Sequence, residues 1–214
     1  MAADKLFWEN PYLTRCEATV TSVDGPAVTV DRTVAFAFSG GQASDSGFIG
    51  GYEIVSARTD GPEIVYTLPA GHGLVPGDIV TVEIDARKRI RLIRLHFAAE
   101  LVLELVTRFF GAPQKVGANI TAEKARVDFV WDGSIASTFT MLEPELRRLV
   151  EADLPVESDF SDAEAQRRFW RVEGFAQVPC GGTHPRTTGE VGSVRLKRVN
   201  PGAGVERIEI TLAD

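Results

Sequence analysis

Cysteine and histidine, which often carry crosslinks or catalysis, are scarce in this 214-residue chain, which has two cysteines and three histidines. Cys16 and Cys180 are too few for a disulfide framework, so a reducing cytoplasm is the expected compartment. No apolar run is long enough to span a bilayer, and the first ten residues lack the apolar stretch of a signal peptide. These absences predict a cytoplasmic protein with no membrane partner.

Basic residues are fewer than acidic ones: the chain has 23 lysines and arginines and 30 aspartates and glutamates, and its net charge is -7. This balance argues against a protein that coats nucleic acid non-specifically. The basic residues are unevenly spread, however, and one short segment holds Arg87, Lys88, Arg89, Arg91 and Arg94. That segment is either the solvated face of a helix or a local docking site for a phosphate backbone.

Short alternating apolar segments dominate the first 85 residues and predict β-structure. Asp24-Gly25 is a hairpin signal between the first two expected strands. The expected strands are residues 17–23, 27–31, 34–38, 48–57, 63–68 and 79–84. Short strands divided by regular turns indicate a small barrel or a curled sheet.

The pattern changes after Asp85, which is typical of a helix N-cap. Residues 86–110 contain neither glycine nor proline, and their apolar residues recur at helical spacing. Gly111 and Pro113 mark the end of this expected helix, which is the longest element. Its start divides a β domain, residues 1–85, from a second domain, residues 86–214.

The second domain mixes strands and helices. Strands are expected around Ile120 and over 126–131 and 156–160, and helices over 137–151 and 161–170, the last from a Ser-Asp-Ala-Glu capping box. Residues 193–199 and 205–212 flank a turn rich in glycine and predict a final hairpin. No internal repeat is present. The predicted fold class is α+β, with a barrel-like domain followed by a sheet with helices.

The candidates for chemistry lie at two places in the second domain. His96 and Glu100 are four residues apart on the expected helix, so they share one face and can grip one ion. Cys180 and His184 bracket two glycines that permit a tight turn, which brings thiolate and imidazole together. Such a donor set suits tetrahedral zinc better than magnesium or calcium. The alternatives are a surface ion pair on the helix and a chance Cys-x-x-x-His.

A segment rich in glycine and serine spans residues 39–47. It is not a phosphate-binding P-loop, because no Gly-Lys-Ser/Thr follows. It is either a plain connection between strands or a loop whose backbone amides and Gln42 side chain approach a ligand. Elsewhere, His72 is expected to be an exposed turn residue, and Cys16 a small buried apolar residue.

Three motifs in this order resemble the alanyl-tRNA editing domains. They are Gly40-Gly41-Gln42-x-x-Asp45-x-Gly47, then His96-x-x-x-Glu100, then Cys180-Gly-Gly-Thr-His184, which Thr188-Gly-Glu-Val-Gly192 follows. Arg126-Val-Asp-Phe129 and Gly204-Val-Glu-Arg207-Ile208 also look like the family, and the length is similar to that of its free-standing, AlaX-type members. The resemblance covers nearly the whole chain, residues 10–212.

The resemblance implies an N-terminal β-barrel, an α+β editing domain and a zinc ion between them. It implies hydrolysis, in trans, of the ester that joins a wrong amino acid, usually serine or glycine, to the tRNA for alanine. The implied Zn2+ ligands are His96, Glu100, Cys180 and His184. The implied partner is the acceptor end of that tRNA, and the oligomeric state stays open.

The expected catalytic residues are Glu100 and Gln42, the latter facing the pocket from the barrel. Backbone amides of the loop around Gln42 are expected to donate hydrogen bonds to an oxyanion, and two arginines to hold the phosphates of the acceptor end. The residues expected on the substrate side are Gly40, Gly41, Ala99, Thr183, Arg89 and Arg91.

Two positions depart from the family's pattern. Family members usually carry histidine where this chain has Glu100, and a glutamate there either ligates the zinc or acts as a general base beside it. They often carry threonine where this chain has Ala99, whose side chain can neither donate nor accept a hydrogen bond. The preferred amino acid therefore stays open.

Three other functions remain open. A metal-dependent hydrolase of a small ester or amide needs the same site without tRNA, and the acidic net charge favours it. A non-catalytic tRNA-binding or zinc-storing relative binds without turnover. A closed structural zinc site fills all four positions, although such sites favour cysteine and histidine over Glu100.

Overall fold

The chain packs as two compact units in the computed structural model, which describes residues 3–213. The first unit holds the residues up to Ser39 together with Ala43–Ile90. The second holds everything from Arg91 onward and also the short segment Gly40–Gln42. The structure is mixed α+β, as expected, while the predicted division into domains 1–85 and 86–214 stays a prediction.

The first unit is a curled antiparallel sheet with the strand order β6-β5-β9-β2-β3-β8-β7. Its strands are β2 (Arg15–Asp24), β3 (Ala27–Val30), β5 (Gly47–Ile49), β6 (Tyr52–Glu53), β7 (Ser56–Asp60), β8 (Glu63–Thr67) and β9 (Ile79–Ile84). The two edge strands, β6 and β7, are separated by only Ile54 and Val55. The amide of Ile54 donates to Gly47 on β5 and that of Val55 to Thr67 on β8. The predicted curled sheet is confirmed.

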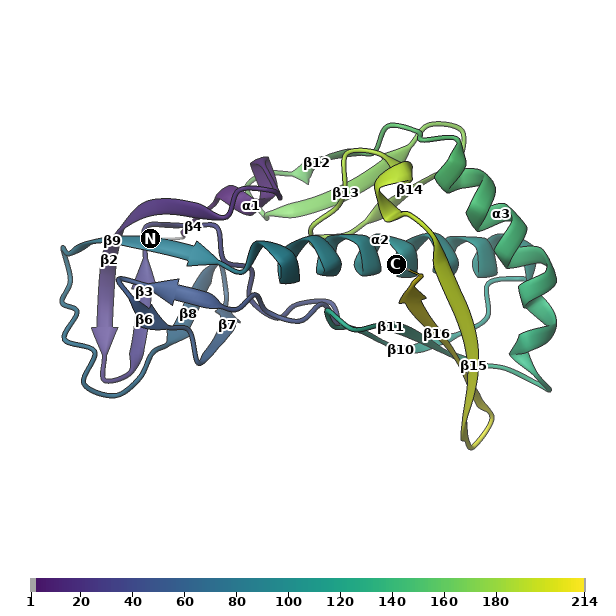
Figure 1. Cartoon of the computed structure of the whole chain (residues 1–214), viewed down its shortest axis with the longest axis horizontal. Coiled ribbons are helices and arrows are strands. Elements are labelled where there is room, and N and C mark those ends of the chain that lie inside the picture. The colour runs from purple at the N-terminus through teal and green to yellow at the C-terminus, as the bar shows by residue number, and fades with distance from the viewer. Residues whose placement is uncertain (1–2, 214) are drawn as a thin grey trace. The chain divides into compact units, whose positions relative to one another are not determined.

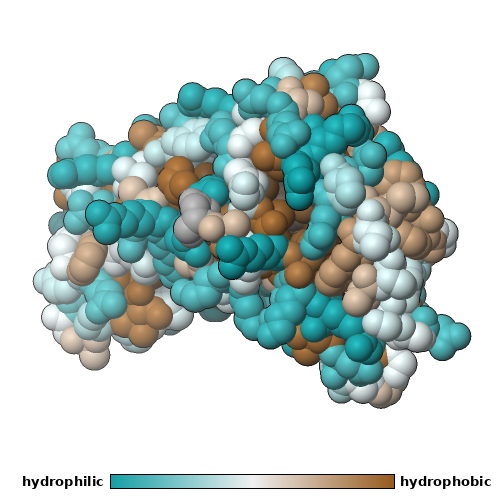
Figure 2. All heavy atoms as spheres, turned by 45° about the vertical axis from the view of Figure 1, so that its right-hand side comes forward, coloured by the Kyte–Doolittle hydropathy of each residue, from teal (hydrophilic) through white to brown (hydrophobic). Residues whose placement is uncertain are grey.

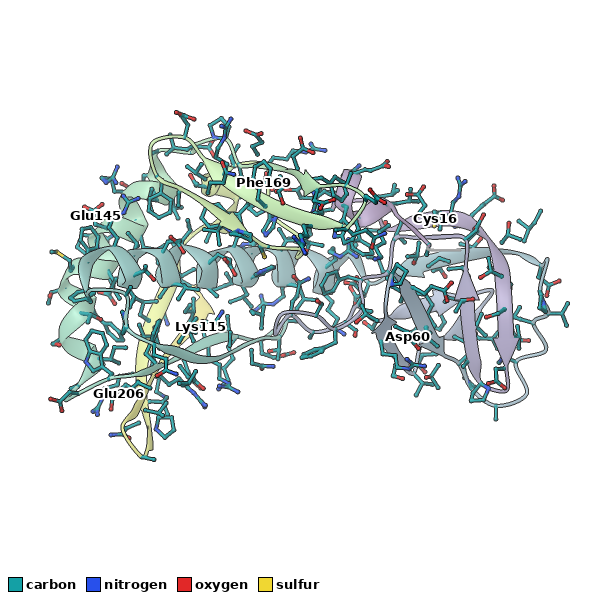
Figure 3. All side chains as sticks on the ribbon, turned by 180° about the vertical axis from the view of Figure 1, so that it is seen from behind. Cys16, Asp60, Lys115, Glu145, Phe169 and Glu206 are labelled. Carbon is teal, nitrogen blue, oxygen red and sulfur yellow. The ribbon has the colours of Figure 1, made fainter. Side chains whose placement is uncertain are left out.

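Short elements complete this unit: β1 (Asp4–Lys5), which pairs in parallel with β4 (Arg32–Thr33), and the helix α1 (Leu6–Glu9). Apolar side chains from the sheet and these elements form one core, in which Phe7, Val28 and Tyr66 are almost fully buried. Cys16, labelled in Figure 3, lies on β2 and packs against this core only partly buried.

Three predictions for this unit are wrong. Residues 34–37 are buried and Phe38 is exposed, but residues 34–38 form no strand, because side chains replace the ladder: Asp45 accepts a hydrogen bond from the amide of Phe36. The expected strand 48–57 is broken by Gly50, whose φ of 59° belongs to a turn. His72 is 4% exposed rather than solvated, with its ring between the carbonyl of Gly25 and the amide of Leu74.

The helix α2 (Ala86–Phe109) begins where predicted, and from Arg91 onward it belongs to the second unit. Asp85 caps it, because its Oδ1 accepts hydrogen bonds from the amides of Arg87 and Lys88 at 2.8 and 3.0 Å. Between Leu92 and Leu105 most side chains are buried on every face, as in a helix covered on more than one side.

Two sheets accompany this helix, with the orders β10-β11-β16-β15 and β12-β13-β14. Their bounds, with those of the remaining helices, are β10 (Lys115–Ile120), β11 (Ala125–Val130), η1 (Ile135–Thr138), α3 (Phe139–Glu151), β12 (Glu157–Asp162), β13 (Arg167–Val172), β14 (Ala176–Pro179), η2 (Thr188–Val191), β15 (Val194–Gly202) and β16 (Val205–Leu212). Figure 1 shows α2 running between the two sheets. Figure 3 labels Lys115 on one sheet and Phe169 on the other.

The expected helix over residues 161–170 is wrong, since β12 and β13 form a hairpin there. Asp162 accepts a hydrogen bond from the amide of Ala165 in the connecting turn, a bond that a turn and a capping box make equally well. The residues after this turn favour a strand over a helix, because alternate side chains are buried on one face of β13: Arg168, Trp170 and Val172.

Exposed apolar side chains are scattered, as Val130, Met141 and Phe109 illustrate at 47%, 49% and 39% exposed. The face in Figure 2 shows such brown patches interrupted by teal hydrophilic residues. Among the described residues, no helix combines the length and apolar character that a membrane crossing requires.

Candidate metal centre

The helix α2 supplies the first candidate ligand, His96. This side chain is 4% exposed, and its Nε2 atom lies 3.4 Å from the Sγ atom of Cys180. The same Nε2 atom lies 3.6 Å from Oε1 of Glu100, one helical turn further along. One face of α2 therefore carries an imidazole that contacts a thiol from a distant part of the chain, and a carboxylate that contacts this imidazole.

The turn Cys180–His184, which follows β14, supplies the other two candidates. The amide of Cys180 donates to the carbonyl of Arg168 on β13 at 2.9 Å, which fixes the start of the turn to the sheet. His184 is 4% exposed, and its Nδ1 atom lies 3.1 Å from the hydroxyl of Ser158 on β12. One ligand atom from each of His96, Cys180 and His184 lies within 4.8 Å of the others.

The charges around this cluster favour a cation. Burial by itself lowers the pKa of His96, but its interactions with Cys180 and Glu100 outweigh burial and raise this pKa to about 10. Burial, with the nearby charges of His96 and Arg168, moves the pKa of His184 well below its usual range, so this ring is neutral. A neutral imidazole is the form that binds a metal.

Two buried nitrogens of the cluster lack a hydrogen-bond partner. Among the described residues, they are the Nε2 atom of His184 and the Nδ1 atom of His96. A buried polar nitrogen without a partner costs free energy unless something else satisfies it. Together with a thiolate and a second imidazole, the Nε2 atom of His184 fits a zinc-type metal ion.

Glu100 is held by a residue that sequence reasoning missed. The indole Nε1 of Trp170 donates to its Oε2 atom at 3.2 Å, which leaves Oε1 toward His96. Burial raises the pKa of Glu100, but the contacts with His96 and Trp170 outweigh it and lower this pKa, so the group is ionised. The strand alternation of β13 was the available signal for Trp170, and the expected helix obscured it.

Gln42 is buried in the second unit and contacts the ligand turn. It is 1% exposed, and its Nε2 atom donates to Oγ1 of Thr183 at 3.0 Å. The amide of Thr183 donates back to Oε1 of Gln42 at 3.3 Å. The side chain predicted to be catalytic, Gln42, and the predicted substrate-side residue Thr183 therefore contact each other. Ala99 lies on α2, 4% exposed.

The predicted phosphate contact by Arg89 is wrong. This side chain is fully buried and pairs with Asp45 through two nitrogens, one of them Nε at 3.1 Å from Oδ1. Its remaining donors reach the carbonyls of Pro11 and Val34. Arg91 is half-buried, and its Nε donates to the carbonyl of Ala122 at 2.6 Å. The basic segment is therefore largely structural, because a charge run does not reveal which members have buried partners.

Comparison with known proteins places these residues among tRNA-editing sequences. Residues 168–209, which include the ligand turn, match the family model described as "Threonyl and Alanyl tRNA synthetase second additional domain". The chain is 27% identical to the alanyl-tRNA editing protein AlaX-M of Pyrococcus horikoshii, over 97% of each chain. It is 28% identical to AlaX-M of Methanosarcina acetivorans, over 98% of each. It is 29% identical to an alanine–tRNA ligase of Methanococcus aeolicus, of which it spans 25%.

Proposed function

We propose that this chain, which is similar over nearly its whole length to free-standing alanyl-tRNA editing proteins, belongs to the same family and hydrolyses mischarged alanine tRNA in trans. The bond broken is the ester between the tRNA and a wrong amino acid, with serine and glycine as the first candidates. The observation that carries the proposal is the convergence of His96, Cys180 and His184, whose ligand atoms lie within 4.8 Å of one another. His96 lies 84 residues before Cys180 in the sequence, so long-range packing brings the helix and the ligand turn together.

The proposed cofactor is zinc, held by His96, Cys180 and His184. When bound, the ion supplies a Lewis acid that polarises an ester carbonyl or a water molecule. The chain's own residues orient the ligands: the hydroxyl of Ser158 contacts His184, and the carbonyl of Arg168 accepts a hydrogen bond from the amide of Cys180. Such outer contacts fix the ring and thiolate directions that a tight site needs.

Glu100 is the proposed fourth ligand. Its Oε1 atom is already on the His96 side, while Trp170 occupies the other oxygen. If Glu100 instead stays off the metal, the same position next to His96 lets it accept a proton from an attacking water as a general base. The two roles differ in one measurable way, because only a ligand contributes to metal affinity.

Substrate recognition near the site is proposed to rely on little hydrogen bonding to the amino-acid side chain. Ala99 offers no hydroxyl on the buried face of α2. A pocket without such a partner gains little from a substrate hydroxyl, so serine and glycine should be released at similar rates. Docking of the acceptor end falls to exposed cations other than Arg89, among them Arg87.

A deacylation assay tests the proposed function. The tRNA for alanine is charged separately with serine, glycine and alanine, and hydrolysis is followed with protein that has been treated with a chelator and then resupplied with Zn2+. We expect rapid loss of the serine and glycine esters, a spared alanine ester, and loss of activity with chelator that zinc restores. Hydrolysis that is equal for all three esters, or indifferent to chelator, would contradict the proposal.

A second candidate is a metal-dependent hydrolase of small aminoacyl esters that does not use tRNA. The burial of Arg89 favours it, because the basic segment loses its central member as a phosphate contact, and the net charge is -7. Free aminoacyl esters offered beside charged tRNA separate the two functions. The tRNA-editing proposal requires the charged tRNA to be cleaved at least tenfold more efficiently.

A further inference from the structure

The side-chain amide of Gln42 is engaged at both ends by a single residue. Its Nε2 atom donates to the hydroxyl of Thr183 at 3.0 Å, and its Oε1 atom accepts from the Thr183 amide at 3.3 Å. A backbone N–H can only donate, so the atom facing it must be the oxygen, which fixes the orientation of the amide. Both residues are 1% exposed. The amide is therefore turned toward protein rather than toward an open pocket.

The backbone that carries Gln42 is itself anchored. Gln42 forms a parallel bridge with Ile120, and the carbonyl of Gly41 accepts from the Ile120 amide at 2.8 Å. Gly41 has a φ of 90°, and a Cβ there would lie 2.7 Å from the carbonyl oxygen of Ala118. Only glycine allows this approach to β10. The segment Gly40–Gln42 thus extends the sheet at its β10 edge, and gives Gln42 a rigid base.

The residue that Gln42 holds lies inside the ligand turn. Thr183 directly precedes His184, and Gly182 precedes Thr183. A Cβ on Gly182 would lie 1.8 Å from Cε1 of His96 and 2.9 Å from Oε1 of Gln42. The backbone of the turn therefore sits directly against the His96 ring and beside the Gln42 amide. Any shift of the turn changes the distances between His96 and the two other ligands.

We propose that Gln42 is a positioning residue that clamps Thr183, and so sets Cys180 and His184 at the correct distance from His96 for the metal ion of the proposed function. It acts through the turn and does not touch the substrate. This replaces the catalytic role expected for Gln42 from the sequence. Thr183 likewise positions the turn, because its hydroxyl accepts the hydrogen bond from the Gln42 amide.

Metal affinity and ligand geometry test this role without any ester substrate. The variants are Gln42→Met, which keeps the side-chain length without its amide, Thr183→Val, which removes the hydroxyl at constant shape, and the double variant. Zn2+ affinity is measured by competition with a chelating dye, and the absorption of Co2+-loaded protein reports the thiolate and imidazole geometry. Each single change should weaken the affinity about tenfold or more, the usual cost of losing an outer-shell contact. The double variant should lose less than the product of the single losses, because the two side chains act as a pair.

Thr183→Ser is the matched control, since it keeps the hydroxyl and should retain wild-type affinity and Co2+ spectrum. If Gln42→Met does not fold by circular dichroism, the Ser and Val variants of Thr183 still decide the question. Wild-type metal affinity and Co2+ spectrum in Gln42→Met or in Thr183→Val would overturn the clamp. If such a metal-replete variant had also lost hydrolysis, Gln42 would act directly on the substrate. A wild-type protein that binds neither Zn2+ nor Co2+ overturns both the clamp and the metal centre, whereas failure of the tRNA assay alone leaves these readouts intact.

Discussion

Replacement of Gly182 by alanine tests how closely the ligand turn must approach the helix. The added methyl would lie 1.8 Å from Cε1 and 2.4 Å from Nδ1 of His96. Ordinary contact starts near 3.4 Å, so ring and turn must separate by about 1.6 Å, the difference between 3.4 and 1.8 Å. The ring has little room to yield, because His96 is 4% exposed on a buried helix.

That separation is about eight times the ±0.2 Å within which metal–ligand distances normally fall. We expect Gly182→Ala to lower metal affinity on the order of 100-fold or more. Overpacking should also reduce the free energy of unfolding by about 1–3 kcal/mol. Elemental analysis after dialysis, dye competition and urea unfolding measure these effects.

Gly181 provides a matched control in the same turn. A Cβ on Gly181 meets no atom within 4 Å, and its φ lies outside the left-handed region. Gly181→Ala should therefore bind metal as tightly as the wild-type protein. Equal metal content in both alanine variants would refute the close approach of the turn to His96, and so the geometry on which the site depends.

Three further predictions concern Glu100, Arg89 and Asp128. Trp170→Phe keeps an aromatic ring but removes the indole hydrogen bond to Glu100, so Zn2+ affinity should fall about tenfold if Glu100 is a ligand. An unchanged affinity in dye competition would show that Glu100 does not ligate the metal. Arg89→Met leaves the buried carboxylate of Asp45 without its partner, which should lower the free energy of unfolding in urea by about 3–5 kcal/mol. The salt dependence of tRNA binding should not change. A weaker dependence of the affinity on salt would identify Arg89 as a phosphate contact. Burial raises the pKa of Asp128, but hydrogen bonds from Arg207 and Arg126 outweigh it and lower this pKa. The stabilising effect of the Asp128 carboxylate is therefore present above about pH 4 and is lost as the pH falls through the folded pKa. The difference in unfolding free energy between wild type and Asp128→Asn should therefore disappear in acid. A difference that is constant with pH would contradict the ion pairing of Asp128.

The sequence predicts most of the elements that local chemistry determines. The long helix follows from 24 residues without glycine or proline, and Asp85 caps it as expected. The final hairpin and the curled sheet follow from alternation and turn residues. The hairpin of β12 and β13 was missed because its turn and a helix capping box use the same short polar residues, and only the buried face of Trp170 separates them.

In the candidate site, too, the sequence predicts the local features but not the contacts between distant segments. Cys180 and His184 could be paired from their spacing alone, because two glycines between them allow one tight turn. Their meeting with His96 depends on long-range packing that spacing does not encode, and the resemblance to a family supplied it. The role of Arg89 was misjudged because a polar side chain on a helix has no sequence mark that tells whether its partner is the protein or the substrate. The same ambiguity holds for Gln42 in its loop, whose catalytic role stays a prediction.

X-ray absorption at the zinc edge of the purified protein tests whether His96, Cys180 and His184 hold a metal ion, because it reports the atoms that surround the ion. We expect one zinc per chain with a single sulfur neighbour at about 2.3 Å and nitrogen or oxygen neighbours at about 2.0–2.1 Å. The sulfur neighbour should disappear in Cys180→Ser. A protein that holds no metal, or a spectrum without sulfur in the wild type, would contradict the proposed metal centre.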